Sequence, residues 1–293
     1  MENIRISGEK ALEAYVIGFE VGSRIGSGLT RHYALGWHTT ATVGTMVAAA
    51  AAAKVLDLDV HQTKMVLGIA QLITCGVFDL EKMDRGLGSS FDIISPGGIS
   101  LKLYSSCYLS QWCIDAMFHL IKEYNTKAGD IDEVIYQLPS AMAQTLRYPY
   151  PKTALEAIFS MGYCMAAALL DGEVSPKVFT DKKIKRPVAQ EIINKVKCIP
   201  TNPDMDLTEA LQQPHTVTVK LKNKKEYSHN VTFPRGDIRN LMSDEEIEAK
   251  FRECASPIFN PKQIACVLEL GWRLESLPLL SELTHALLGS EKS

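Results

Sequence analysis

The sequence predicts a mostly α-helical protein with an α+β part between roughly residues 99 and 232. Apolar residues recur at helical spacing through the first quarter of the chain and again near its C-terminal end. A stretch dense in Gly, Ser and Pro, "DRGLGSSFDIISPGG", interrupts this pattern, and short β-like runs alternate with helices beyond it. We therefore expect a helical domain over residues 1–98, an α+β domain over residues 99–235, and C-terminal helices over residues 236–293 that return to the helical domain.

The first two helices are indicated by periodicity and by their end signals. The segment "EKALEAYVIGFEVGSRIGSG" should begin after Ser7 or Gly8 and end near Gly28. The second helix follows "GWHTT", where Thr39 or Thr40 is expected to act as the N-cap. Its alanine run narrows the helix, so that a neighbouring helix can approach closely.

A third helix is predicted to open at Asp59, because Gln62 stands at the spacing of a capping box. Apolar residues at helical spacing predict which face of this helix is buried. The expected buried stripe comprises Met65, Val66, Ile69, Leu72 and Ile73.

The α+β part contains two clear β signals. "EVIYQLP" at residues 133–139 predicts one strand, and "TVTVKLKNKKEYSHNVTF" predicts a hairpin that turns at residues 223–225. His215 and His229 flank this hairpin and are expected to face solvent. Farther along, Ser243 with Glu246 predicts the start of a late helix by capping-box spacing, and the C-terminal segment is helical again.

Composition excludes several functional classes. A formal net charge of −3 and a pI near 6.2 provide no electrostatic attraction to nucleic acid or to an anionic membrane. The seven cysteines are odd in number and scattered, without zinc-like spacing, which is typical of reduced thiols in a cytosolic or matrix compartment. The longest apolar run, around residues 47–53, is too short to span a bilayer. We expect a soluble, cytoplasmic or mitochondrial-matrix protein without metal ligands, nucleic-acid partner or membrane association.

Five blocks occur in order along nearly the whole chain: "GFEVGSRIG", "GWHTTATVGTMVAAAAAAKVLDLD", "KLYSSCYLSQWCIDA", "PKTALEAIFSMGYCMAAALLDG" and "SDEEIEAKF". Together they resemble the MmgE/PrpD superfamily, which includes 2-methylcitrate dehydratase and cis-aconitate decarboxylase. The resemblance implies a homodimer with a large helical domain and a smaller α+β lid domain, and an active site between the two. It also implies a lyase of small di- and tricarboxylates, which couples proton transfer next to a carboxylate to loss of water or carbon dioxide and uses no cofactor.

The sequence departs from this family pattern at three places. Relatives carry a helical segment with an acidic residue and a His-Pro-Ser/Thr motif ahead of "GFEVGSRIG", and a Thr-Lys-x-x-His-x-Gly insertion between "GIAQLITCG" and "VFDLEKMDRGLG"; neither is found here. Ala143 stands where cis-aconitate decarboxylase carries a tyrosine. The helical domain is therefore expected to be incomplete. A truncated, catalytically impaired homologue that acts as a binding or dimerisation partner is the alternative to an active lyase.

His38 is the candidate catalytic residue, because it directly precedes the alanine-rich helix. At a helix N-terminus, free N–H groups and the macrodipole attract an anion, so the imidazole and the helix end can bind one carboxylate. An imidazole that titrates near neutral pH can take the proton α to a carboxylate, or return one after decarboxylation. From spacing alone, a histidine that only caps or packs is favoured; the family resemblance implies an active-site histidine.

Three further residues are candidates for substrate binding. Lys102 matches a family lysine at the start of the lid-domain motif, and its compact charge suits a carboxylate, although a solvated surface lysine is the plain alternative. Cys107 occupies a position where relatives have cysteine or histidine, and it either lines the pocket or is a small buried thiol. Arg85, in the glycine-rich "DRGLGSS", offers a guanidinium to an anion, while an ordinary loop is the favoured alternative.

Overall fold

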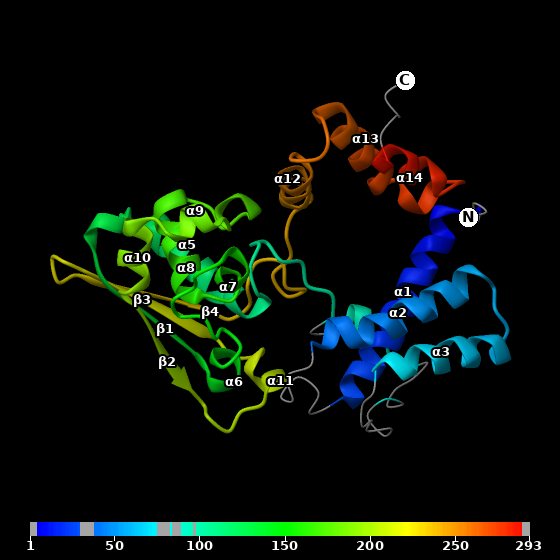
Figure 1. Ribbon diagram of the computed structural model, residues 1–293, viewed down its shortest axis with the longest axis horizontal. Coiled ribbons are helices and arrows are strands. Elements are labelled where there is room, and N and C mark those ends of the chain that lie inside the picture. Colours follow the sequence, from blue (N-terminus) through cyan, green and yellow to red (C-terminus); the bar gives the residue numbers. More distant parts are fainter. Residues whose placement is uncertain (1–4, 30–37, 75–82, 84–88, 96–97, 289–293) are drawn as a thin grey trace. The chain divides into compact units, whose positions relative to one another are not determined.

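The protein is mostly helical, with one small mixed β-sheet. The computed structural model describes residues 5–29, 38–74, 83, 89–95 and 98–288. The chain divides into two compact units, one formed by residues 1–99 with 255–293 and the other by residues 100–254. Figure 1 shows the helices of the first unit in blue, cyan, orange and red, and the sheet of the second unit in green and yellow. No helix among the described residues is both long enough and apolar enough to cross a lipid bilayer.

The first unit is built from helices. They are α1 (Gly8–Gly28), α2 (Thr39–Val55), α3 (Val60–Thr74), α13 (Pro261–Trp272) and α14 (Ser281–Leu288), with 3-10 turns at Asp92–Ile94 and Leu274–Ser276. Helix α2 packs against both α1 and α3 (Figure 1). The N–H of Gly8 donates to the carbonyl of Leu277 at 2.9 Å, and that of Leu280 donates to Ile6 at 2.8 Å. These bonds join the start of the chain to its C-terminal helices.

Local capping signals place the starts of α1 and α3 as the sequence predicts. Ser7 caps α1, because its hydroxyl oxygen accepts from the N–H of Lys10 at 3.1 Å. At the start of α3, the N–H of Asp59 donates to Gln62 Oε1 at 3.0 Å, and the N–H of Gln62 donates to Asp59 Oδ1 at 2.8 Å. This is a reciprocal capping box.

The predicted buried stripe of α3 is wrong at two of its residues. Met65 is 56% exposed and Ile69 is 61% exposed, whereas Ala70 is buried. The small apolar cluster of this unit consists of Ile25, Leu29, Val43, Met46 and Ala70. Helix α3 therefore meets its neighbours through a face that carries Ala70 and the partly buried Leu67, and it leaves Met65 and Ile69 uncovered. The side chains of Leu72 and Ile73 lie outside the described part of the chain.

The second unit contains a four-stranded mixed sheet in the order β2-β1-β3-β4. The strands are β1 (Ile131–Pro139), β2 (Val196–Thr201), β3 (His215–Leu221) and β4 (Glu226–Val231). Strand β1 pairs parallel to β2 and antiparallel to β3, and β3 and β4 form an antiparallel hairpin. The predicted strand and hairpin are confirmed, with β1 starting two residues earlier than expected. Strand β2 was not predicted.

Helices complete the second unit. They are α5 (Gln111–Tyr124), α6 (Ser140–Ala143), α7 (Ala154–Ala157), α8 (Met161–Asp171), α9 (Asp181–Ile184), α10 (Pro187–Ile193), α11 (Leu207–Ala210) and α12 (Asp244–Ala255). Short 3-10 turns lie at Tyr108–Ser110, Ala128–Asp130 and Pro176–Val178. Helix α12 begins with the predicted capping box, in which the N–H of Ser243 donates to Glu246 at 2.8 Å and the N–H of Glu246 donates to Ser243 Oγ at 3.3 Å.

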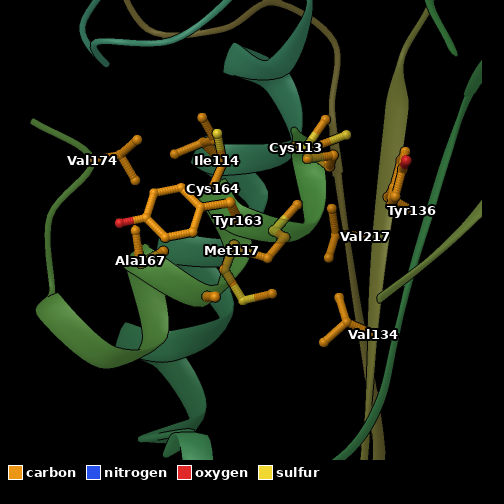
Figure 2. Close-up of a cluster of buried hydrophobic side chains, with 14 of the residues drawn as sticks. Cys113, Ile114, Met117, Val134, Tyr136, Tyr163, Cys164, Ala167, Val174 and Val217 are labelled. Atoms are coloured by element: carbon orange, nitrogen blue, oxygen red, sulfur yellow. The ribbon is translucent and has the colours of Figure 1, made fainter. Parts of the chain in front are cut away.

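The core of this unit lies between the helices α5 and α8 and the sheet. Figure 2 shows Met117 of α5 and Tyr163 of α8 gathered with Val134 and Val217 of the sheet. All four side chains are fully buried. The Tyr163 hydroxyl donates to the carbonyl of Val178, so the polar end of this buried ring is satisfied. This layered packing gives the second unit a continuous apolar core.

The expectation that His215 faces solvent is wrong. His215 is 0% exposed, and its ring lies 4.8 Å from that of Trp112, measured between centroids. The reason is strand alternation, since β3 buries every second residue and His215 is in phase with Val217 and Val219. His229 is half-buried and stacks on His119 at a centroid distance of 3.6 Å.

Candidate functional site

His38 is the N-cap residue of α2, and its side chain is exposed. Its backbone is extended, with φ −83° and ψ 106°, and its carbonyl accepts from the N–H groups of Ala41 at 2.9 Å and Thr42 at 3.2 Å. The prediction that Thr39 or Thr40 is the N-cap is wrong, because the chain enters the helical conformation already at Thr39. The imidazole makes no capping hydrogen bond. The side chain is therefore not used as a cap, and it belongs to the residue at the N-terminal, positive end of the helix dipole.

The helix behind His38 is held by close backbone approach. A Cβ at Gly22 of α1 would lie 2.2 Å from Val47 Cγ2, and one at Gly18 would lie 3.2 Å from Ala51 Cβ. Glycine on α1 therefore faces the small-residue run of α2, as the alanine content of that run predicts. Such packing leaves little freedom for α2 to shift, which gives His38 a rigid support.

Lys102 and Cys107 belong to the second unit. Lys102 is exposed and follows Leu101, whose N–H donates to the carbonyl of Gly236 at 2.8 Å. Gly236 has φ 91°, and a Cβ there would lie 2.1 Å from the carbonyl oxygen of Leu101, so only glycine fits beside this chain segment. The segment that carries Lys102 is thereby anchored to the loop after β4.

Cys107 is half-buried at the start of a 3-10 turn. Burial raises the pKa of its thiol, and the nearby charge of Lys102 lowers the same pKa by a smaller amount. The two side chains are therefore close enough to interact, and Cys107 is a neutral thiol near pH 7. A neutral thiol can line a pocket or donate a weak hydrogen bond, but it is a poor nucleophile.

A polar group that sequence reasoning missed lies beside this turn. The Tyr108 hydroxyl donates to Asp237 Oδ2 at 3.2 Å, and the guanidinium of Arg239 donates to Asp237 Oδ1 at 2.8 Å. Burial opposes ionisation of Asp237, but the hydrogen bonds from Arg239 outweigh it and lower the carboxyl pKa. Tyr108 follows Cys107 directly, yet Asp237 and Arg239 are far along the chain, so no local spacing signals the cluster.

The other candidates contribute less to the described structure. Arg85 lies outside the described residues. Ala143 ends the short helix α6, and its methyl group cannot transfer a proton as a tyrosine hydroxyl can. Across the part of the chain that the structure describes, no three His, Cys, Asp or Glu side chains gather as a metal-binding group.

Two family models match the chain. The MmgE/PrpD N-terminal domain matches residues 1–83, and the MmgE/PrpD C-terminal domain matches residues 104–275. His38 lies inside the first match and Cys107 inside the second, and Lys102 stands two residues before the second.

Similar proteins include several that are named cis-aconitate decarboxylase. The protein of Mus musculus is 23% identical over 344 aligned residues, which cover 97% of this chain and 69% of the relative. That of Homo sapiens is 24% identical over 349 residues, covering 97% and 70%, and that of Aspergillus terreus is 21% identical over 350 residues, covering 96% and 71%. An alignment of 344 positions is longer than the 293-residue chain, so it includes positions where the relative has residues and this chain has none.

Proposed function

The chain belongs to the MmgE/PrpD family, and from this premise we propose that it is a lyase acting on a small di- or tricarboxylate. The family includes dehydratases and decarboxylases, and the relatives named above are distant homologues. The observation that carries the proposal is the exposed imidazole of His38 at the N-terminus of the 17-residue helix α2. An acid–base group and an anion-binding helix end therefore occur at one place.

In this proposal, His38 moves the proton and Lys102 binds a carboxylate. For dehydration, the imidazole removes the proton α to a carboxylate, the C–H electron pair forms the new C=C bond, and the β-hydroxyl takes up a proton and leaves as water. For decarboxylation, the C–C bond breaks to release carbon dioxide, and the imidazolium protonates the carbon that keeps the electron pair. The uncharged thiol of Cys107 lines the carboxylate-binding site near Lys102. The protein acts as a homodimer without cofactor, as the family resemblance implies.

The test is proton exchange followed by NMR in deuterated water. The purified chain is offered citrate-, aconitate- and succinate-like acids, and the loss of carbon-bound proton signals is recorded. We expect exchange or turnover with at least one acid, and a reduction of about 100-fold or more in His38→Ala, because general acid–base groups typically contribute about 10²–10⁴-fold.

Matched control variants separate catalysis from folding. His61 on α3 is an exposed histidine of the same unit, so His61→Ala should keep the activity. Lys102→Ala should raise KM more than it lowers kcat, whereas Lys182→Ala, at an exposed lysine of the second unit, should change neither. Equal loss in His38→Ala and His61→Ala would contradict the assigned role of His38.

A second candidate function is that of a catalytically impaired binding or dimerisation partner. It is favoured by the alignment positions that this chain lacks and by the exposed Met65 and Ile69 on α3. Uncovered apolar side chains on neighbouring turns of one helix favour association with another surface. Analytical ultracentrifugation should then show obligate association, and the proton-exchange assay should show no turnover. A well-behaved compact monomer would count against this candidate.

A further inference from the structure

A pocket of about 760 Å³ lies within the second unit, at residues that the proposed reaction does not use. Helix α5 lines it with Asp115, Phe118, His119 and Lys122, which share one helix face because they are spaced by three or four residues. Strand β4 contributes His229. The pocket therefore forms where α5 packs along β4, the edge strand of the sheet.

Helix α5 runs along β4 in the opposite direction, and ring pairs mark this alignment. His119 stacks on His229 with centroids 3.6 Å apart and an interplanar angle of 15°, and Tyr124 stacks on Tyr227 at 3.9 Å and 9°. Rings from two turns of α5 therefore stack on His229 and Tyr227, which are two residues apart on β4 and point to the same face of the sheet. This holds both imidazoles in place at the pocket wall.

The carboxylates of the pocket are already occupied. Asp115 accepts from the Tyr104 hydroxyl at 2.7 Å and from the N–H of Arg235 at 2.6 Å. The guanidinium of Arg235 donates to Glu246 from Nε at 3.1 Å. Arg239, which also lines the pocket, is held in the same way by Asp237, which does not line it. The negative charges are therefore satisfied by hydrogen bonds and ion pairs from within the protein.

Three donors remain without such partners. Neither imidazole of the His119–His229 pair hydrogen-bonds to a described residue, and Lys122, one turn farther along α5, forms no ion pair with any residue that the structure describes. His119 and Lys122 are exposed, so a ligand can reach them from solvent. Two imidazoles and an ammonium group at one pocket are hydrogen-bond donors of the kind that binds an oxyanion.

We propose that this pocket binds a small anion carrying two or more negative charges, held by Lys122 and by a proton that the His119–His229 pair takes up on binding. The shared chemistry is that of a phosphate or of a di- or tricarboxylate. The residues that line the pocket do not include His38, Lys102 or Cys107. A divalent metal fits less well, because the ammonium group of Lys122 stands beside the imidazoles and the described residues supply no third metal ligand.

Proton uptake follows from the surroundings of the pair. Burial lowers the pKa of His229, and the neighbouring His119 lowers it further, so His229 resists a proton near pH 7. A bound dianion stabilises the protonated form. The charged and titratable groups that face the pair are Asp115 and Lys122 on α5, Tyr104 before it, Arg235 and Arg239 after β4, and Glu246 on α12. Affinity should therefore rise as the pH falls.

The experiment titrates the full chain with inorganic phosphate, citrate and succinate at pH 7.5 and pH 6.0, using calorimetry together with histidine ring signals in NMR. We expect saturable binding. For succinate, which keeps most of its second negative charge at pH 6.0, the affinity should be at least about threefold higher at pH 6.0, because one proton is taken up with the anion. The arms with phosphate and with carboxylates distinguish the two sources of the ligand.

Variants identify the site. His229→Gln and Lys122→Gln should each weaken binding by about tenfold or more, since a charge-assisted hydrogen bond is lost. His61→Ala and Lys182→Gln, at an exposed histidine and an exposed lysine without an assigned role, should leave this binding unchanged, which separates it from general surface charge. Absence of saturable binding, succinate binding that tightens as the pH rises, or binding that survives both pocket variants would each overturn the proposal.

Discussion

The two units differ in how they bury apolar surface. Among the residues that the structure describes, the largest fully buried side chains, such as Trp112, Tyr163 and Met117, all belong to the α+β unit. The helical unit instead packs glycine against valine and alanine, and its small cluster contains Ile25 and Met46. Large apolar side chains such as Met65 remain exposed there.

The α+β unit is therefore stabilised mainly by the burial of large apolar side chains, whereas the helical unit depends on the close approach of helix backbones. Burial of large side chains stabilises by about 1.5–3 kcal/mol for each residue. Close approach of small residues contributes less apolar area and is sensitive to a single added methyl group. The two units should therefore respond differently to the same kind of substitution.

The largest expected effect is the loss of Trp112. Trp112→Ala should lower the free energy of unfolding by about 3–5 kcal/mol, because a fully buried indole is removed and its hydrogen bond to the carbonyl of Thr232 is lost. Met65→Ala, at a 56% exposed position of the helical unit, should change it by less than about 0.5 kcal/mol. Urea unfolding followed by circular dichroism measures both. Similar changes in unfolding free energy for the two variants would contradict the difference in packing between the units.

An intermediate effect is expected from pH, through His215. Burial lowers the pKa of His215 to about 4, below its value of about 6.5 in an unfolded chain. The unfolded state therefore binds more protons as the pH falls from about 6.5 towards 4, and the folded state loses stability over this window, by at most about 1.4 kcal/mol per pH unit.

His215→Phe should remove this contribution and flatten the dependence of unfolding free energy on pH. His61→Phe, at an exposed histidine of α3, is the matched control and should leave the slope as it is in the unmodified chain. A slope that His215→Phe does not alter would show that other groups govern acid stability.

The smallest expected effects come from glycines of the helical unit. Gly22→Ala should destabilise by about 1–3 kcal/mol, since the new Cβ would lie 2.2 Å from the stiff side chain of Val47. Gly44→Ala meets nothing within 4 Å and should stabilise by up to about 1 kcal/mol through helix propensity. Thermal unfolding of the two variants gives the sign of each change, and a stabilising Gly22→Ala would refute close packing of α1 on α2.

Short-range signals were the most predictable part of the fold. The caps at Ser7, Asp59 and Ser243 and the hairpin turn involve groups only two to four residues apart, so the local sequence is sufficient to specify them. Strand β2 was missed because it is short, contains Pro200 and is defined only by its pairing with β1, which lies far earlier in the chain. Long-range pairing leaves no such local signal.

For the candidate site, the sequence was sufficient to place His38 at the start of a helix. It was not sufficient to show that the imidazole makes no capping hydrogen bond, nor that Cys107 lies near Lys102, because both depend on backbone conformation and on neighbours in space. The pocket beside His119 and His229 was not foreseen, since the strands β1, β2 and β3 and several helices lie between these histidines in the sequence.

By itself, the sequence determined the family, the helix and strand signals, and the position of His38 at the start of α2, because these depend on local spacing and on the order of sequence blocks along one chain. Only the tertiary structure decided which faces were buried. The amphipathic pattern of α3 predicted burial of Met65, yet its neighbours cover Ala70 instead, and strand alternation buried His215 against Trp112. The physical reason is that burial depends on the surface that a partner element presents, and that surface is assembled from distant parts of the chain.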